Sequence, residues 1–160
     1  MDIVIINRQR TKKISARLLK QIVSALLAEL GIEDAELGIR LVASREMARV
    51  NQQFLQHEGP TDVITFDYQD SASGMRHSPD RLHGEVFVCV DEAATQAREF
   101  ATTWQAEVVR YIVHGILHLL GHDDGQTALR RKMKREENRL LRRLEKRFPL
   151  AELQARAAGR

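Results

Sequence analysis

Two histidines, His114 and His118, stand four residues apart in a segment that is otherwise apolar. In an α-helix this spacing places both imidazoles on one face, within reach of each other. The surrounding residues, 108–120, are apolar nearly all round, which indicates a mostly buried helix. Two neutral, buried imidazoles at this spacing resist protonation and form half of a tetrahedral zinc site. The segment therefore predicts a metal centre.

A third metal ligand must come from beyond the end of this helix. On a straight helix His122 would lie roughly 12 Å from His114 at 1.5 Å per residue, too far to share one ion. Gly121 favours the left-handed conformation that ends helices, so the chain can fold back and offer either His122 or Asp124. Either residue would complete a three-ligand site with an open position for water, which is the catalytic rather than the structural arrangement.

The histidine pair also has an ordinary explanation, because two histidines four residues apart occur by chance and often make only a polar contact. Three features favour a metal: the apolar helix, the His/Asp cluster that follows it, and the glycine between the histidines. Gly115 costs the helix about 1 kcal/mol relative to alanine, without an evident packing reason in the sequence. The same glycine stands where the zinc proteases of the His-Glu-x-x-His type carry a glutamate, which argues against ordinary metalloprotease chemistry.

The elements that must position this segment follow from hydrophobic periodicity. Helices are expected over residues 15–30, 44–54, 91–100, 103–120 and 126–147, with Ser15 as the first N-cap. Strands are expected over residues 2–7, 37–42, 61–66 and 84–90, and a surface loop over residues 69–83. Helices and strands mix without strict alternation, so the pattern favours an α+β or α/β class with a four-stranded sheet. We expect Cys89, Phe100 and Trp104 in the core, and His77 and His83 exposed to solvent.

Length and composition limit the remaining possibilities. The chain has 160 residues, of which 43% are hydrophobic, enough for one domain, expected over residues 1–150, with a frayed tail over 151–160. No apolar run approaches the ~20 residues that a membrane helix needs. The N-terminus lacks a secretion signal, and the single cysteine excludes an intrachain disulfide, so a cytoplasmic protein is expected.

The net charge of +3 conceals an uneven distribution. Residues 130–160 carry 12 Lys/Arg and 4 Asp/Glu, a net +8, so the first 129 residues carry a net −5. A basic C-terminal arm on an acidic body suggests a polyanionic partner such as nucleic acid. It also fits a helix whose charges serve solubility, since three glutamates are interleaved for local pairing.

The segment His114 to Asp123 resembles the hallmark of the YbeY family of endoribonucleases and ribosomal RNA maturation factors. That hallmark reads His-Gly-x-Leu-His-Leu-x-Gly-[aromatic or His]-Asp-His. The order and spacing of further motifs agree over about residues 37–145; these are Asn51-Gln52-Gln53-Phe54, Pro60-Thr61-Asp62-Val63-Ile64-Thr65-Phe66, Gly84-Glu85-Val86-Phe87-Val88, Glu107 and Met133-x-x-Glu136.

The resemblance implies an α+β fold in which a small mixed four-stranded sheet packs with about five helices and the metal site lies at the end of a buried central helix. It implies one Zn²⁺ per chain, or another divalent metal, held by two helix histidines and a ligand just after the helix. The implied activity is metal-dependent cleavage of single-stranded RNA by a metal-activated water. The implied role is maturation and quality control of ribosomal RNA in contact with the small subunit or ribosomal proteins, without DNA or membranes as partners.

The chain departs from the family pattern at positions that carry chemistry. The third histidine of the hallmark is replaced by Asp124, which we expect as the third ligand, with His122 as the runner-up. The family arginine after the Asn-x-x-aromatic motif is replaced by Leu55, which removes a natural phosphate clamp. Its candidate replacements are His57, Arg76 and Arg81.

We expect His114, Asp62 and Thr61 as catalytic residues, with the last two orienting water or the ligands by analogy with the family. Thr61 and Asp62 also have a structural explanation, since Thr-Asp after a proline can simply start the strand. Glu85 would either bond a ligand imidazole or be ordinary polarity at the sheet edge. Two other functions stay open: a non-catalytic ribosome-assembly or RNA-binding factor with a structural metal, which Leu55 favours, and a metal hydrolase of a non-RNA substrate. The basic helix favours the two RNA-related functions.

Overall fold

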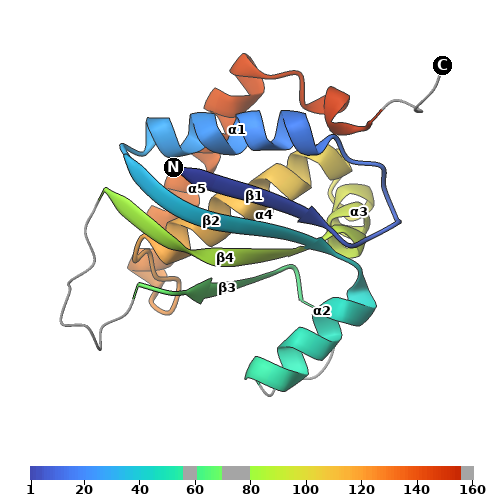
Figure 1. The fold of residues 1–160 in the computed structure, drawn as a ribbon, viewed down its shortest axis with the longest axis horizontal. Helices are drawn as coiled ribbons and strands as arrows, with labels where there is room; N and C mark the ends of the chain where they lie inside the picture. The colour runs from blue at the N-terminus through green and yellow to red at the C-terminus, as the bar shows by residue number, and fades with distance from the viewer. Residues whose placement is uncertain (56–60, 70–79, 156–160) are drawn as a thin grey trace.

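The computed structural model describes residues 1–55, 61–69 and 80–155 as one four-stranded sheet with helices packed on it (Figure 1). The strands are β1 (Asp2–Asn7), β2 (Asp34–Val42), β3 (Val63–Asp67) and β4 (Arg81–Cys89). The α-helices are α1 (Ala16–Glu29), α2 (Ser44–Val50), α3 (Val90–Glu99), α4 (Trp104–Leu119) and α5 (Thr127–Arg147). A π-helical turn (Asn51–Leu55) follows α2, and a 3-10 helix (Leu150–Leu153) follows α5.

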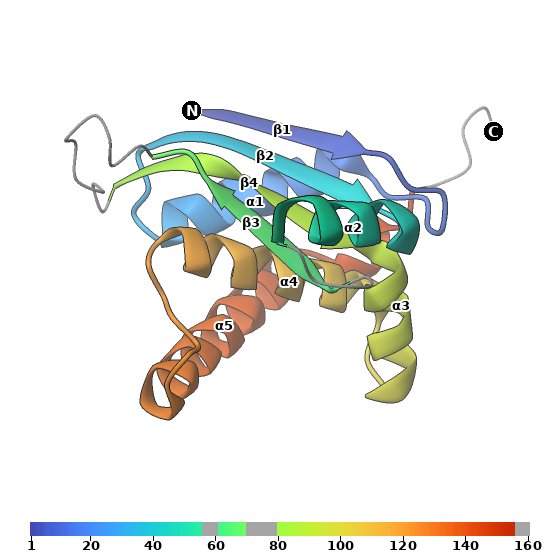
Figure 2. The same ribbon diagram turned by 90° about the horizontal axis from the view of Figure 1, so that it is seen from below.

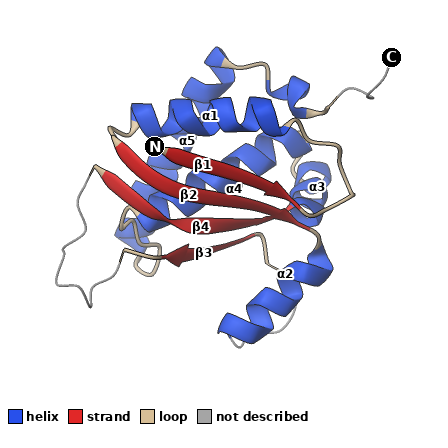
Figure 3. Cartoon of the chain, viewed as in Figure 1, coloured by secondary structure: helices blue, strands red, loops and turns tan. Residues whose placement is uncertain are grey.

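The sheet is mixed, with the strand order β1-β2-β4-β3. Strands β1, β2 and β4 run parallel, and β3 pairs antiparallel with β4. Five α-helices and a mixed four-stranded sheet confirm the α+β class (Figure 3). Among the described helices, none is long and apolar enough to cross a membrane.

Helices α1, α4 and α5 lie on the same side of the sheet (Figure 2). Helix α4 is the central one, and Ile112, Ile116 and Leu117 are almost fully buried between the sheet and its neighbouring helices. On the opposite face, α2 covers one end of the sheet, where Met47 and Val50 form a second small core. The candidate metal segment therefore lies on a helix fixed from several sides, as expected for a site that needs accurate geometry.

Gly115 allows α4 to approach the sheet closely. A Cβ atom at this position would lie 2.7 Å from Val86 Cγ1 and 3.2 Å from Thr65 Cγ2. The glycine therefore has a packing reason, and the interpretation of it as a sign of metal binding is wrong. The helix gives up intrinsic stability here because β3 and β4 leave no room for a side chain.

The ends of α4 are defined by local hydrogen bonds. Thr103 Oγ1 caps the first turn by accepting from Ala106 N at 3.1 Å. At the other end Gly121 has φ 97°, the left-handed conformation predicted from the sequence. Gly121 N donates to His118 O at 3.0 Å and His122 N donates to Leu117 O at 3.0 Å, which together form a Schellman motif. This motif reverses the chain directly after the second histidine.

Several elements differ from the sequence-based expectations. Strand β4 begins at Arg81, inside the expected loop of residues 69–83, because it pairs with β2 along its full length. Phe100 was expected in the core and is 63% exposed, since α3 ends one residue earlier, whereas Cys89 is fully buried as expected. The tail expected to fray from residue 151 is instead anchored as far as the structure describes it: Leu153 is buried, and Ala155 N donates to Lys13 O at 2.9 Å.

Candidate metal centre

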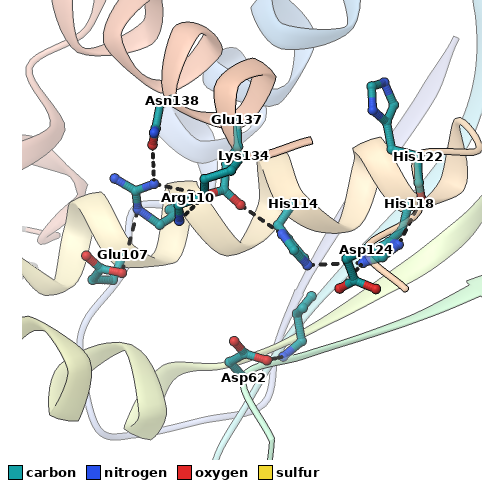
Figure 4. Close-up of polar contacts among 11 residues, drawn as sticks. Asp62, Glu107, Arg110, His114, His118, His122, Asp124, Lys134, Glu137 and Asn138 are labelled. Carbon is teal, nitrogen blue, oxygen red and sulfur yellow. Dashed lines mark hydrogen bonds and ion pairs between the residues drawn. The ribbon is translucent and has the colours of Figure 1, made fainter. Parts of the chain in front are cut away.

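Three side chains that are separated by up to ten residues in the sequence converge at the C-terminal end of α4: His114, His118 and Asp124 (Figure 4). The two Nε2 atoms of the histidines lie 3.1 Å apart, and His118 Nε2 lies 3.6 Å from Asp124 Oδ2. One ligand atom from each residue falls within 4.8 Å of the other two. Around a tetrahedral zinc ion with bonds of 2.0–2.1 Å, neighbouring donor atoms lie about 3.3 Å apart. The three residues therefore form a group that could hold a metal ion.

The hydrogen bonds of the two imidazoles test whether a cation fits between them. His114 Nδ1 lies 2.8 Å from Glu137 Oε1, and His118 Nδ1 lies 3.1 Å from the carbonyl oxygen of His122. Both partners accept hydrogen bonds, so both Nδ1 atoms carry the proton and, in the neutral rings, both Nε2 atoms carry a lone pair. Two lone pairs that face each other at 3.1 Å repel, and a bound cation removes this repulsion. The nitrogen and carboxylate donors suit zinc.

His122 takes part through its backbone and not through its ring. The Schellman motif aims its carbonyl at His118 Nδ1, and its imidazole points away from the other two (Figure 4). The ring lies outside the group formed by His114, His118 and Asp124. Sequence spacing alone left His122 and Asp124 as alternatives. The backbone conformation of the turn after α4 determines which of the two side chains lies next to His114 and His118.

Glu137 of α5 orients the first histidine, and the sequence analysis missed it. Its side chain is 3% exposed and accepts hydrogen bonds from His114 Nδ1, from Lys134 Nζ at 2.8 Å and from Arg110 Nη1 at 2.9 Å. Burial alone would raise the pKa of the Glu137 carboxyl, but these hydrogen bonds and the charge of Lys134 lower the pKa to about 2. The carboxylate is therefore ionised at neutral pH and fixes the His114 ring.

The sequence does contain a signal for Glu137. It lies four residues after Met133 and three before Leu140, on the stripe of α5 that the sequence marks as buried. An acidic residue on an apolar stripe calls for a polar partner. The family resemblance instead pointed to Glu136, which pairs with Arg139 and contacts none of the three candidate ligands.

Two hollows adjoin the candidate ligands. One, of about 470 Å³, lies between α3, α4 and α5, and its lining includes Asp62, Arg110 and His114. Arg110 stands one helical turn before His114, and its Nη1 donates to Asn138 Oδ1 at 2.8 Å as well as to Glu137. The other, of about 360 Å³, lies between the end of α4 and the first turns of α5. His114 lines both hollows.

The other residues singled out from the sequence fall in different places. Asp62 is exposed and lines the larger hollow, while its Oδ1 accepts from Val63 N at 2.8 Å and from Thr61 Oγ1 at 3.3 Å at the start of β3. Thr61 does not line that hollow. Glu85 pairs with Arg40 at 2.8 Å on the opposite face of the sheet, so the suggestion that it bonds a ligand imidazole is wrong.

Of the three candidates for a phosphate clamp, the structure describes Arg81, which lines neither of the two hollows. Arg81 pairs with Asp34 at 3.2 Å at the start of β4. His57 and Arg76 lie outside the described residues, as does His77. His83 is exposed as expected and pairs with Glu36 at 3.3 Å. Two of the cations beside the candidate ligands, Arg110 and Lys134, bond to Glu137 and were not singled out from the sequence.

Comparison with known proteins shows to which family the chain belongs. The profile of the family described as Endoribonuclease YbeY matches residues 4–145. The chain is 33% identical over 132 residues to an Endoribonuclease YbeY of Salinibacter ruber (82% of this chain, 84% of the relative). It is 34% identical over 144 residues to that of Syntrophotalea carbinolica (89% of this chain, 95% of the relative). The solution structure of TM1509 from Thermotoga maritima superposes with a TM-score of 0.67 at 25% identity, covering 99% of each chain. This chain belongs to the YbeY family.

Proposed function

We propose that this chain is a metal-dependent endoribonuclease that cleaves single-stranded RNA during the maturation and quality control of ribosomal RNA. One zinc ion per chain would be held by His114, His118 and Asp124. The observation that carries the metal part of the proposal is the approach of the two Nε2 atoms to 3.1 Å of each other, with Asp124 Oδ2 3.6 Å from His118 Nε2. The endoribonuclease part is supported by the name shared by relatives that are 32–39% identical to this chain.

A zinc ion held by these three residues would have room for a water as a further ligand, as catalytic zinc sites do. A zinc ion bound there supplies a Lewis acid for a phosphate oxygen and a water of lowered pKa. Glu137 accepts a hydrogen bond from His114 Nδ1, which would leave Nε2 available to hold the metal. Asp62, which lines the larger hollow together with His114, would orient a water or accept its proton.

Arg110 is the proposed phosphate clamp. Its guanidinium is fixed by Glu137 and Asn138, and its side chain is still 25% exposed to the hollow that contains His114. A fixed guanidinium stabilises the negative charge that develops on the phosphate better than a mobile one does, because it does not have to reorganise during the reaction. This role was expected of His57, Arg76 or Arg81.

A second candidate function is a ribosome-assembly or RNA-binding factor in which the metal is structural. Leu55 favours it, because this exposed apolar side chain replaces the arginine of the family pattern. In both cases the proposed partners are ribosomal RNA and the small subunit or its proteins, in the cytoplasm. The two functions differ in whether RNA is cleaved.

The deciding experiment measures zinc content and RNA cleavage together. Protein purified without a metal-affinity tag is compared with Asp124→Ala and with the control His122→Ala, which keeps the backbone carbonyl bonded to His118. We expect about one zinc per chain in the wild type and in the control, and a sharp loss of zinc and cleavage in Asp124→Ala. A wild-type protein that contains zinc but does not cleave RNA would favour the assembly factor. A wild-type protein without metal would refute the proposal that the chain is a metal-dependent hydrolase. Zinc lost only from His122→Ala would show that our ligand assignment is wrong.

A further inference from the structure

Basic side chains from the first turns of α5 border the candidate metal centre. The hollow of about 360 Å³ is lined by the proposed ligands His114 and Asp124 on one side and by Arg130, Arg131 and Lys134 on the other. Figure 4 shows Lys134 and Glu137 of α5 next to His114. We call these three cations the α5 basic edge. A molecule bound in this hollow would lie beside these cations.

The charge along α5 is concentrated at the end that adjoins the candidate metal centre. Residues 127–135 carry five Lys/Arg and no Asp/Glu, whereas residues 136–147 carry five Lys/Arg and three glutamates. In the second half, Arg143 lies 2.6 Å and Arg139 3.7 Å from Glu29 of α1. The first half of the helix therefore has the larger unbalanced positive charge.

Helix stability does not explain this arrangement. The N-terminal end of a helix carries a partial positive charge, which favours acidic residues and disfavours cations there. Helix α5 has no acidic residue in its first turn and no side-chain cap on Gln126. A divalent cation held by His114 and Asp124 would add to the repulsion. An anion bound between the helix and the metal would offset both effects.

Two of the three cations, Arg131 and Arg130, have N–H groups that are available to bind a ligand. Arg131 has no carboxylate within ion-pair distance among residues 1–55, 61–69 and 80–155. Arg130 uses only Nε, which donates to the backbone oxygen of Asp124 at 3.1 Å. Lys134 contacts Glu137 at 2.8 Å and still has 60% of its side chain exposed. Guanidinium groups with free N–H donors bind phosphate oxygens in a bidentate manner.

We propose that the α5 basic edge binds the backbone phosphates of single-stranded RNA on one side of the bond that is cleaved. The inference rests on the proposed function and goes beyond it by assigning the surface and the part of the RNA that it contacts. Contacts of this kind set the position of the strand but do not read its sequence. The edge therefore holds any single-stranded RNA in register with the metal, independent of its bases.

The test compares two double variants that remove the same charge from different ends of α5. Arg130→Gln with Arg131→Gln removes the edge. Arg142→Gln with Lys146→Gln is the control, since Arg142 lies about 16 Å farther along the helix than Arg131 at 1.5 Å per residue. Binding of a fluorescein-labelled uridine decamer to the full-length protein, as purified, is measured by anisotropy between 50 and 200 mM salt. A gel after each titration verifies that the RNA is intact, and a deoxyuridine decamer of equal charge replaces it if it is cleaved.

Each phosphate contact on a single strand contributes about 0.7 to the slope of log K against log salt, so the edge variant should lose about 1.4 from the slope. Over this fourfold salt range, the wild-type affinity should fall about sevenfold more than that of the edge variant. The control variant, and a variant with both arginines replaced by lysine, should keep the wild-type slope. Equal slopes in the edge and wild-type proteins, or equal losses in the edge and control variants, would overturn the proposal.

Zinc content and cleavage are measured on every variant, which separates this proposal from the proposed function. A wild type that binds RNA with the expected slope but does not cleave it would refute the nuclease and leave the α5 basic edge intact. If the double edge variant loses zinc because Arg130 supports the Asp124 loop, then Arg131→Gln alone decides the question. This residue contacts none of the described candidate ligands, and its loss should reduce the slope by about 0.7.

Discussion

Replacing Glu137 tests how the proposed metal centre is held together. Glu137 is buried, with only 2% of the residue exposed. Its carboxylate accepts hydrogen bonds from His114 and Arg110 of α4 and from Lys134 of α5. Glu137→Gln keeps the shape and one acceptor for His114 Nδ1 but removes the charge. Glu137→Ala removes the acceptor as well. Glu136→Gln is the matched control, because the neighbouring side chain pairs with Arg139 and does not contact the candidate ligands.

The expected loss can be worked from the contacts. Removing a group that orients a metal-binding histidine weakens metal affinity by about 10–100-fold, which corresponds to about 1.4–2.8 kcal/mol. We expect Glu137→Gln near the lower value and Glu137→Ala near the upper one, because only the alanine variant frees the His114 ring. Removing one member of a fully buried ion pair costs about 3–5 kcal/mol of folding free energy. Arg110 and His114 remain 25% and 29% exposed, so we expect about 2 kcal/mol here.

The assay is competition for zinc with a chromogenic chelator at pH 7, together with urea unfolding of the metal-free proteins. Affinity should fall in the order wild type, Glu137→Gln, Glu137→Ala, while Glu136→Gln matches the wild type. Wild-type zinc affinity in both Glu137 variants would refute the argument that this carboxylate fixes the ligand. A loss of equal size in Glu136→Gln would show that only the overall charge of α5 matters.

Three further predictions concern the elements that carry the site. Gly115→Ala should lower stability by up to about 2 kcal/mol in urea unfolding, because overpacking against the sheet outweighs the gain of about 1 kcal/mol in helix propensity; a more stable variant would contradict the close approach. Thr103→Ala should cost about 1 kcal/mol through loss of the α4 cap, and an unchanged unfolding midpoint would argue against that cap. Burial alone would raise the pKa of Asp91, but hydrogen bonds from Thr11 and Ser44 hold it below its ordinary 3.8. The depressed pKa adds stability above pH 3.8 that is lost as the pH falls through the folded value, so Asp91→Asn should destabilise the protein at pH 7 and lie closer to the wild type below pH 3; an equal difference at both pH values would refute this.

The sequence determined most of the elements and indicated the candidate ligands. The three- and four-residue periodicity of α1, α4 and α5 marks their buried faces, and the β-branched runs mark the strands. Gly121 predicted where α4 ends, since only a residue that tolerates positive φ suits that turn. The four-residue spacing of His114 and His118 is a property of the helix alone, so it could be read without the fold.

Only the tertiary structure decided what surrounds the two histidines. The contact between Glu137 and His114 joins residues 23 positions apart on different helices, and no local pattern encodes that pairing. The reason for Gly115 lies in the approach of β3 and β4, which belong to another part of the chain. The reversal after Gly121 brings Asp124 and the His122 carbonyl to opposite edges of the His118 ring. The sequence specified the candidate ligands that a helix can present, whereas packing between distant elements determined the groups that orient them and the hollows that adjoin them.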